Sequence, residues 1–196
     1  MNPVSPAIEM RLPEVLPLER FIRLLAHVGL VGAIVGDHYA VLVVEMDSLD
    51  DIAGRYGQLL ADHCERILTR RMRESMPTDG LMTRLRPGAF GVMAFGATSE
   101  DEALSFAAHL RERLEAPVPP GTPNGDLVVR VSIGVAFTSG VVRAVDAMQA
   151  AERAVARVRL TGGAGTFVSR AAAQQPQDPR PATVPARELL SMEIGR

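Results

Sequence analysis

The sequence predicts an α/β fold of the α+β type, in which helices surround a central, mainly antiparallel sheet of five strands. Three observations support this prediction: short β-branched runs, segments with apolar residues at helical spacing between them, and a hairpin near the middle of the chain. The resulting order is helix, strand, helix, hairpin, helix, strand, helix, strand, which only a few folds accommodate. The chain has 196 residues and is 47% hydrophobic, enough for one well-cored domain.

The first half of the chain predicts two helical regions around one strand. Apolar residues recur at helical spacing from Leu18 to Val28, which predicts a helix there. The β-branched run from Tyr39 to Met46 is typical of a central strand buried on both faces. The stretch 48–51 supplies capping residues, and an apolar stripe over 58–76 predicts a long helix that Pro77 ends.

The second half opens with two strands, 81–85 and 90–95, whose connection Arg86-Pro87-Gly88-Ala89 predicts a hairpin. Proline at the second and glycine at the third position of this turn favour type II. Ser99 or Glu100 opens a helix that runs to Leu114. Strict alternation over 126–137 predicts one strand, and a helix over 144–160 precedes a glycine-rich turn and a last strand, 166–168.

We expect three regions along the chain: a flexible N-terminus (1–11), one domain (12–170) and a disordered tail (171–196). The tail is rich in proline and glutamine and has too few apolar side chains to offset the entropy of ordering. For the stretch 187–194 two interpretations remain open, a frayed end or a short amphipathic helix that docks on this domain or a partner.

Composition excludes several classes of protein. A formal net charge of -2 argues against nucleic-acid binding, which usually needs a basic face. The charge-free run 24–36 is shorter than the roughly 20 residues that span a bilayer, and charged residues interrupt the N-terminus where a signal peptide would lie. The four histidines lack metal-ligand spacing, and the single Cys64 allows no disulfide within the chain. We therefore expect a cytoplasmic protein that binds neither membranes nor nucleic acid.

Five segments, in order, resemble the GGDEF domain of diguanylate cyclases, enzymes that join two GTP molecules into cyclic di-GMP. The resemblance spans about 12–168, with lengths that align without gaps from Glu45 to Phe90. The landmarks are Glu45-Met46-Asp47, Ile52 to Gly57 followed by Asp62, the hairpin Arg84 to Phe95, Val131 to Ala136, and Ala151 to Ala154.

The resemblance implies that two acidic positions hold the divalent metal ions of catalysis. The first is Glu45, and Asp47 lies on the same face of the strand, so these two are candidate remnant metal ligands. The second should be the third residue of the signature pentapeptide, which here reads Arg86-Pro87-Gly88-Ala89-Phe90. That residue is Gly88, so we assign no catalytic residue and expect turnover to be lost.

The nucleotide site that the resemblance implies is also incomplete. The asparagine that reads guanine corresponds to Ala53, while its partner carboxylate is kept as Asp62, and a phosphate-facing lysine aligns with Arg159. Asp62 and Arg159 are the candidate remnant of this site, with a solvated or capping carboxylate as the alternative interpretation of Asp62. Asp50 would repel a triphosphate. The inhibitory Arg-x-x-Asp motif aligns with 77–80 and lacks both ends.

These residues predict a catalytically inactive GGDEF-like domain that acts as a regulatory or protein-interaction module in cyclic di-GMP or nucleotide signalling. Its expected partner is a second copy of the chain or another signalling protein. The first alternative is a sensor that binds GTP or a related nucleotide without turnover, and the second is an active cyclase with unusual ligands. No cofactor is expected, and Mg²⁺ would bind only together with a nucleotide.

Overall fold

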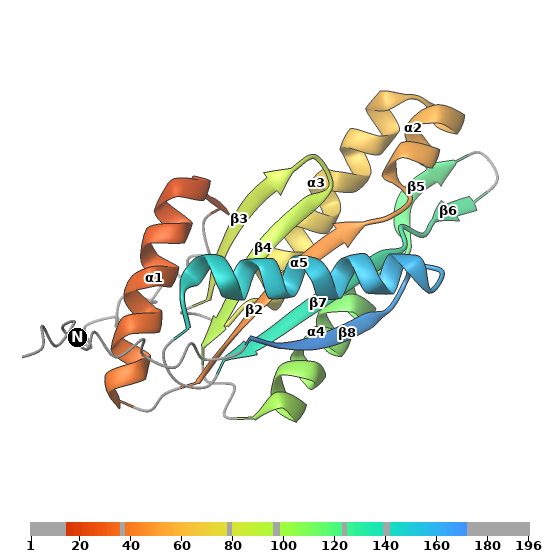
Figure 1. Cartoon of the computed structure of the whole chain (residues 1–196). Helices are drawn as coiled ribbons and strands as arrows, with labels where there is room; N and C mark the ends of the chain where they lie inside the picture. Colours follow the sequence, from red (N-terminus) through yellow and green to blue (C-terminus); the bar gives the residue numbers. More distant parts are fainter. Residues whose placement is uncertain are drawn as a thin grey trace, which may run out of the picture.

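The computed structural model describes residues 15–35, 38–77, 80–95, 99–122, 125–138 and 142–171. Five helices and eight strands lie within these ranges (Figure 1). They are β1 (Val15–Leu16), α1 (Leu18–Val35), β2 (Tyr39–Met46), α2 (Leu49–Tyr56), α3 (Gln58–Ser75), β3 (Leu81–Arg86), β4 (Ala89–Phe95), α4 (Glu100–Leu114), β5 (Val118–Thr122), β6 (Gly125–Leu127), β7 (Val131–Thr138), α5 (Ala144–Leu160) and β8 (Thr166–Ala171).

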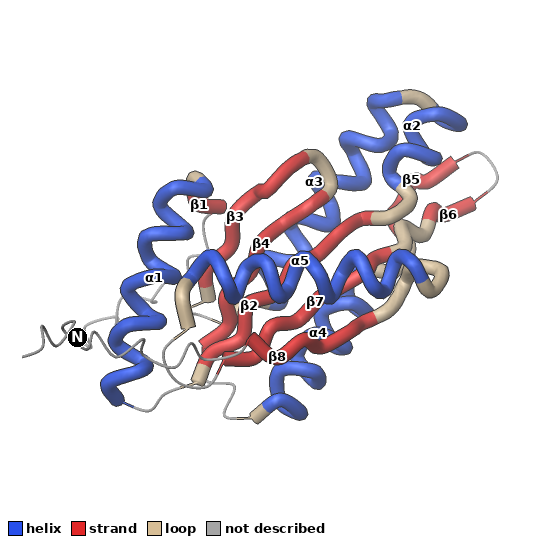
Figure 2. The backbone as a smooth tube through the Cα atoms, viewed as in Figure 1, coloured by secondary structure: helices blue, strands red, loops and turns tan. Residues whose placement is uncertain are grey.

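The main sheet has the strand order β1-β3-β4-β2-β7-β8. Its four inner strands pair antiparallel, and the two outer strands pair parallel with their neighbours, so the predicted mixed and mainly antiparallel sheet is confirmed. Helices cover both of its faces (Figures 1 and 2). The sheet has six strands rather than the predicted five, because Val15–Leu16 pairs with β3 and the Thr83 hydroxyl donates to the Leu16 carbonyl at 2.9 Å.

Strand β2 lies at the centre and is buried on both faces, as its β-branched run predicts. Alternate side chains enter two cores, since successive residues of a strand point to opposite faces. Leu42 and Val44 pack in the core that α2, α3 and α4 cover, whereas Val41 and Val43 pack in the core under α1 and α5. The end of β2 is thereby fixed from both sides.

Helix α5 packs directly on the backbone of β7 at Gly134. A Cβ atom at this position would lie 2.2 Å from the Ala151 carbonyl oxygen and 2.3 Å from the Val155 nitrogen, so only glycine allows the helix to approach so closely. This contact sets the position of the helix whose C-terminal end carries Arg159.

Several element boundaries differ from the predictions. Helix α1 extends to Val35 rather than 28, and the proline-rich segment after α4 forms β5, which pairs with β6 in a separate hairpin. The alternating run 126–137 is two strands, β6 and β7, separated by 128–130. Alternation alone does not distinguish one strand from two that belong to different sheets. The expected N-terminus 1–11 and, from residue 172 on, the expected tail lie outside the described residues.

Candidate functional site

The β3–β4 hairpin ends in the predicted turn. Gly88 has a φ of +69°. A positive φ at the third residue is what defines a type II turn, and proline is common at the residue before it. Its carbonyl accepts a hydrogen bond from the Met46 amide at 2.9 Å, and its own amide donates to Glu65 at 3.2 Å. Arg84 also pairs with Glu65, at 2.7 Å. The tip of the hairpin is therefore fastened both to the end of β2 and to α3.

Glu45 lies at the end of β2, opposite Ala89, and its side chain is only 9% exposed. Two guanidinium groups hold its carboxylate: Arg86 from the hairpin donates to Oε1, and Arg159 from α5 donates to Oε2 at 3.1 Å. Each oxygen of this buried carboxylate thus has a cationic partner, as burial of a charge demands. The arginines carry between them the two positive charges that a divalent cation would supply.

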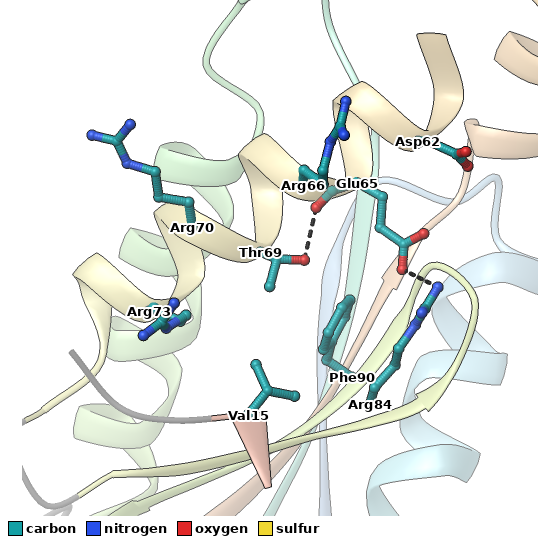
Figure 3. A pocket seen from close by; sticks show the side chains of 9 residues that line it. All are labelled: Val15, Asp62, Glu65, Arg66, Thr69, Arg70, Arg73, Arg84 and Phe90. Atoms are coloured by element: carbon teal, nitrogen blue, oxygen red, sulfur yellow. Dashed lines mark hydrogen bonds and ion pairs between the residues drawn. The ribbon is translucent and has the colours of Figure 1, made fainter. Parts of the chain in front are cut away.

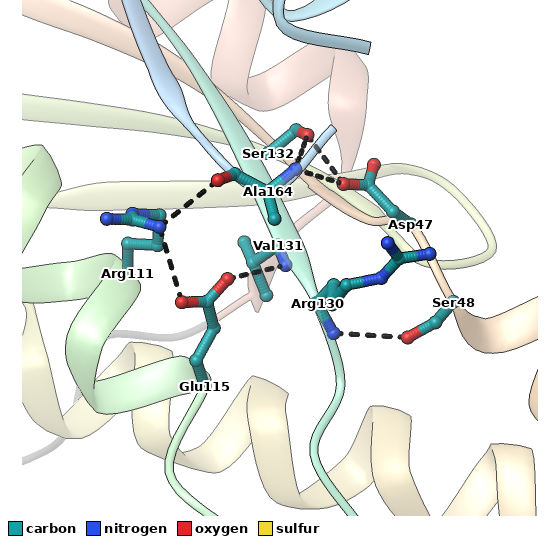
Figure 4. A network of polar contacts seen from close by, with 8 residues as sticks. All are labelled: Asp47, Ser48, Arg111, Glu115, Arg130, Val131, Ser132 and Ala164. Atoms are coloured by element: carbon teal, nitrogen blue, oxygen red, sulfur yellow. Dashed lines mark hydrogen bonds and ion pairs between the residues drawn. The ribbon is translucent and has the colours of Figure 1, made fainter. Parts of the chain in front are cut away.

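Asp47 enters a different network, shown in Figure 4. Its Oδ2 accepts hydrogen bonds from the Ser132 hydroxyl at 2.5 Å and from the Ala164 amide at 3.1 Å. Its Oδ1 is buried without a hydrogen-bond partner. Ala164 has a φ of +52°, in the left-handed region that is unfavourable for a residue with a Cβ atom. Asp47 therefore joins the end of β2 to β7 and holds the loop between α5 and β8.

The same loop is held from its other side by α4 (Figure 4). Arg111 donates to the Ala164 carbonyl at 3.2 Å and to the Glu115 carboxylate at 3.4 Å, and Glu115 accepts from the Val131 amide at 3.1 Å. Ser48 was predicted to cap α2, but its hydroxyl instead accepts from the Arg130 amide at 3.1 Å. Polar side chains in this region bind backbone groups of the protein itself.

A small cavity of about 110 Å³ lies between α2, α3 and the hairpin tip. It brings together several residues of the nucleotide site that the resemblance implies, since Ala53, Asp62 and Gly88 all line it, and Asp50 adds a negative charge. The side chain of Leu49 narrows this cavity at the hairpin tip. Its Cδ1 atom packs so close to Gly88 that a Cβ atom built on residue 88 would lie only 2.9 Å from it. Pockets that enclose a nucleotide-sized ligand usually measure about 300–1,000 Å³.

A larger cavity of about 580 Å³ lies between α3 and strands β1, β3 and β4 (Figure 3). Val15 and the ring of Phe90 line it below α3. The charged residues of its lining are Asp62, Glu65, Arg66, Arg70, Arg73 and Arg84. Four arginines and two carboxylates make this lining positively charged.

The predicted site residues therefore fall into three places. Asp62 lines both cavities and accepts a hydrogen bond from Gln58 at 2.8 Å. Arg159 lies with Glu45, and Asp47 lies in its own network. Among the described residues, no hydrogen bond or ion pair joins Asp62 to Arg159. Cation binding by Glu45 and Asp47 stays a prediction. The contacts of Glu45 do not fit it, since a cation there would have to displace a guanidinium group.

The sequence analysis missed Glu65 and the arginines of α3. Glu65 lies one helical turn after Asp62, and Arg66, Arg70 and Arg73 follow at spacings of four and three, so all could share one side of the helix. That spacing was the available signal. Among the described residues, no group of three or more histidine, cysteine, aspartate or glutamate side chains is placed to hold a metal ion.

The family model "Diguanylate cyclase, GGDEF domain" matches residues 30–164 of the chain. The chain belongs to the GGDEF domain family. The solved GGDEF domain of DgcB from Caulobacter crescentus, in complex with c-di-GMP, superposes with a TM-score of 0.72 at 14% identity and covers 84% of this chain and 98% of that one. The solved diguanylate cyclase SiaD of Pseudomonas aeruginosa, in complex with its activator SiaC, gives a TM-score of 0.70 at 16% identity over 77% of this chain and 57% of that one. At these identities the likeness shows the GGDEF fold.

A curated relative is nearer in sequence. The uncharacterized protein y4lL of Sinorhizobium fredii is 31% identical over 130 residues, which are 66% of this chain. The chain spans only 15% of the length of that relative. None of the helices in the described part of this GGDEF chain is long and apolar enough to cross a membrane.

Proposed function

We propose that this chain is a GGDEF domain that does not make cyclic di-GMP and that regulates signalling through contact with a protein partner. The observation that carries the proposal is the pairing of the Glu45 carboxylate with Arg86 and Arg159. Diguanylate cyclase chemistry depends on carboxylates that hold divalent cations, and these cations activate the hydroxyl and neutralise the triphosphate. Here guanidinium groups satisfy the carboxylate at the end of β2.

The hairpin supports the same proposal. Gly88, at the position of the second acid, has no side-chain oxygen, and Ala89 beside it is 2% exposed. The turn itself is well formed, because Pro87 and Gly88 suit its dihedral angles. The tip thus keeps the shape of the GGDEF hairpin and lacks the group that would hold a cation there.

The small cavity supports it further. At about 110 Å³ it has too little room for GTP, and Asp50 gives its lining a negative charge that would repel phosphate. Alanine at position 53 offers no amide to a base. A nucleotide would have to move α2 away from the hairpin before it could enter.

The proposal that the domain acts through a protein partner has support from a relative. SiaD, which is similar in fold, was solved in complex with its activator SiaC. The partner of this chain is proposed to be a second GGDEF domain, of its own or another kind, or a separate signalling protein.

A second candidate function, a sensor that binds a nucleotide without turnover, is favoured by one observation. Asp62 keeps the carboxylate of the base-reading pair and faces the larger cavity, whose volume of about 580 Å³ would admit a base. Titration calorimetry with GTP and Mg²⁺ separates the two candidates. A heat of binding that is measured with the unaltered chain and is lost in the variant Asp62→Ala would support the sensor. If the unaltered chain gives no heat of binding, the sensor hypothesis is excluded.

The experiment that tests the main proposal is conversion of GTP to cyclic di-GMP by the purified chain with Mg²⁺ or Mn²⁺. We expect no product. Product that forms and is abolished by Glu45→Ala would refute the proposal, because it would place Glu45 on a catalytic cation. Glu152→Ala is the matched control, since it removes an exposed carboxylate of α5 that, among the described residues, forms no ion pair with Arg86 or Arg159.

A further inference from the structure

We infer that the outer edge of β8 binds an extended segment of a partner protein as an added strand, in which acidic side chains recur at every second position. This inference rests on the proposed function, since it names the surface and the chemistry through which the domain would contact its partner. Strand β8 (Thr166–Ala171) lies at one edge of the main sheet and, in the described part of the chain, pairs only with β7 (Figures 1 and 2).

The first argument is the hydrogen bonding of the β8 backbone. Strands β7 and β8 are parallel, with Ile133 opposite Thr166, and the Ile133 amide donates to the Gly165 carbonyl at 2.9 Å. In a parallel pair the amide and the carbonyl of one residue point to the same side, and that side alternates along the strand. The register therefore directs both groups of Phe167 toward β7 and those of its neighbours Thr166 and Val168 outward. An edge with such groups is a template for another strand.

The second argument is charge. Arg157 of α5 extends over β8, and its guanidinium carbon lies 4.8 Å from the centre of the Phe167 ring. Arg153 precedes Arg157 by four residues and so lies on the same side of the helix. Both arginines are exposed, and among the described residues neither forms an ion pair with a carboxylate. A strand added beside β8 would therefore be attracted through acidic side chains on its α5 side.

The third argument is spacing. A short loop, 161–165, joins α5 to β8, and the two elements pack against each other and so run in opposite directions. The helical turn from Arg157 back to Arg153 advances about 6 Å along α5. Two residues of an extended strand advance about 6.6 Å and return to the same face. Acidic side chains at alternate positions of the added strand would therefore meet the two arginines in turn.

The test uses the whole chain and a fluorescein-labelled seven-residue peptide that alternates glutamate and threonine, with binding followed by fluorescence anisotropy at low ionic strength. The double variant Arg153→Gln with Arg157→Gln should weaken binding at least tenfold. The control double variant Arg55→Gln with Arg66→Gln removes the same charge from exposed residues of α2 and α3, which cover the other face of the sheet. It should leave the dissociation constant within twofold.

Hydrogen exchange of the β8 amides separates an added strand from attraction between charges alone. In the free chain the Val168 amide should exchange at least tenfold faster than the Phe167 amide, which β7 holds. Saturation with the peptide should slow the Val168 amide at least tenfold and change the Phe167 amide less than twofold. A peptide of the same composition with its glutamates in one block should bind at least fivefold more weakly.

The inference is overturned if the alternating peptide does not bind, if both double variants weaken binding equally, if the block peptide binds as well, or if binding leaves the exchange of Val168 unchanged. A Val168 amide that is already protected in the free chain also overturns it, because a second copy or another part of the chain would then cover the edge. Sedimentation at two concentrations tells these two apart. Cyclic di-GMP synthesis, measured separately, would refute the proposed function without touching this result.

Discussion

Arg159 of α5 donates to Glu45 Oε2 at 3.1 Å, although 114 residues separate the two along the chain. The contact exists because α5 lies on β7 and β2, so that its last turn reaches the end of the central strand. Glu45 is thereby the point at which the central strand, the hairpin and α5 meet. Its electrostatics can be tested without reference to any activity.

The three charges at this point should contribute unequally to stability. The side chains of Arg86 and Arg159 are 52% and 60% exposed, whereas that of Glu45 is 9% exposed. The double variant Arg86→Ala with Arg159→Ala leaves a buried carboxylate without a cationic partner. It should lower the free energy of unfolding by about 3 kcal/mol. Glu45→Gln leaves two arginines that water can solvate and should cost only about 1 kcal/mol.

Urea denaturation measures both changes. Adding Glu45→Gln to the double arginine variant should recover part of the loss, because no buried charge is then left unpaired. If Glu45→Gln lowered the free energy of unfolding as much as the double arginine variant does, the result would contradict the pairing of Glu45 with Arg86 and Arg159.

Replacing Gly88 by any other residue should lower the free energy of unfolding. Its φ of +69° is unfavourable for a residue with a Cβ atom, and Leu49 Cδ1 lies 2.9 Å from where that atom would be. Gly88→Ala should therefore destabilise by roughly 1–2 kcal/mol. Gly54 in α2 has nothing within 4 Å of the equivalent position, so Gly54→Ala should instead stabilise by roughly 0.5–1 kcal/mol. Shifts of the same sign in the two melting curves would be evidence against this geometry.

The contact of α5 with β7 predicts a much larger effect. Gly134→Ala would press a methyl group against backbone atoms of Ala151 and Val155, which have no rotamer through which to move aside. We expect a loss of about 3 kcal/mol or more. Circular dichroism during thermal unfolding would show it. A variant as stable as the parent chain would mean that α5 can lift from the sheet freely.

The loop between α5 and β8 should depend on Asp47 and Ser132. Ser132→Ala removes one of the hydrogen bonds to the Asp47 carboxylate and should cost about 1 kcal/mol. The Ala164 amide donates both to Asp47 Oδ2 and to Ser132 Oγ, each at 3.1 Å. Asp47→Ala combined with Ser132→Ala removes both acceptors, so the exchange of that amide with solvent should become faster by more than tenfold in the double variant. The exposed Ser105→Ala serves as control. Unchanged protection of Ala164 in the double variant would show that Arg111, which binds the Ala164 carbonyl, holds the loop without Asp47 and Ser132.

Cys64 should react slowly with thiol reagents. Burial raises the pKa of its thiol, and the residue is completely shielded from solvent. At pH 8 the folded chain should therefore be labelled only as fast as it opens, whereas the chain in urea should react at once. Fast labelling of the folded chain would contradict this burial.

Much of the fold could be predicted because its strands and helices carry regular apolar patterns. The run from Tyr39 to Met46 is apolar on both faces and lies at the centre of the sheet. Strand β1 could not be predicted, since two residues between prolines have no periodicity. The break after β6 was missed because Val129 stays buried between the two strands and continues the alternation.

The candidate site was predictable only where its chemistry is local. Pro87 and Gly88 specify a turn by themselves, and the turn formed. The partners of Glu45 depend on the pairing of β2 with β4 and on the placement of α5, neither of which a linear pattern contains. The same holds for the size of the cavity at Asp62, which the packing of Leu49 determines.

The pairing of Glu45 with two arginines also bears on evolution. A single change of Gly88 to an acid would introduce a strained residue beside a carboxylate that already has its cations. Loss of Arg86 or Arg159 alone would leave that carboxylate half paired. On the proposed function, an acid at position 88 would therefore meet a cation only after Arg86 and Arg159 were replaced as well, so cation binding would require several substitutions together.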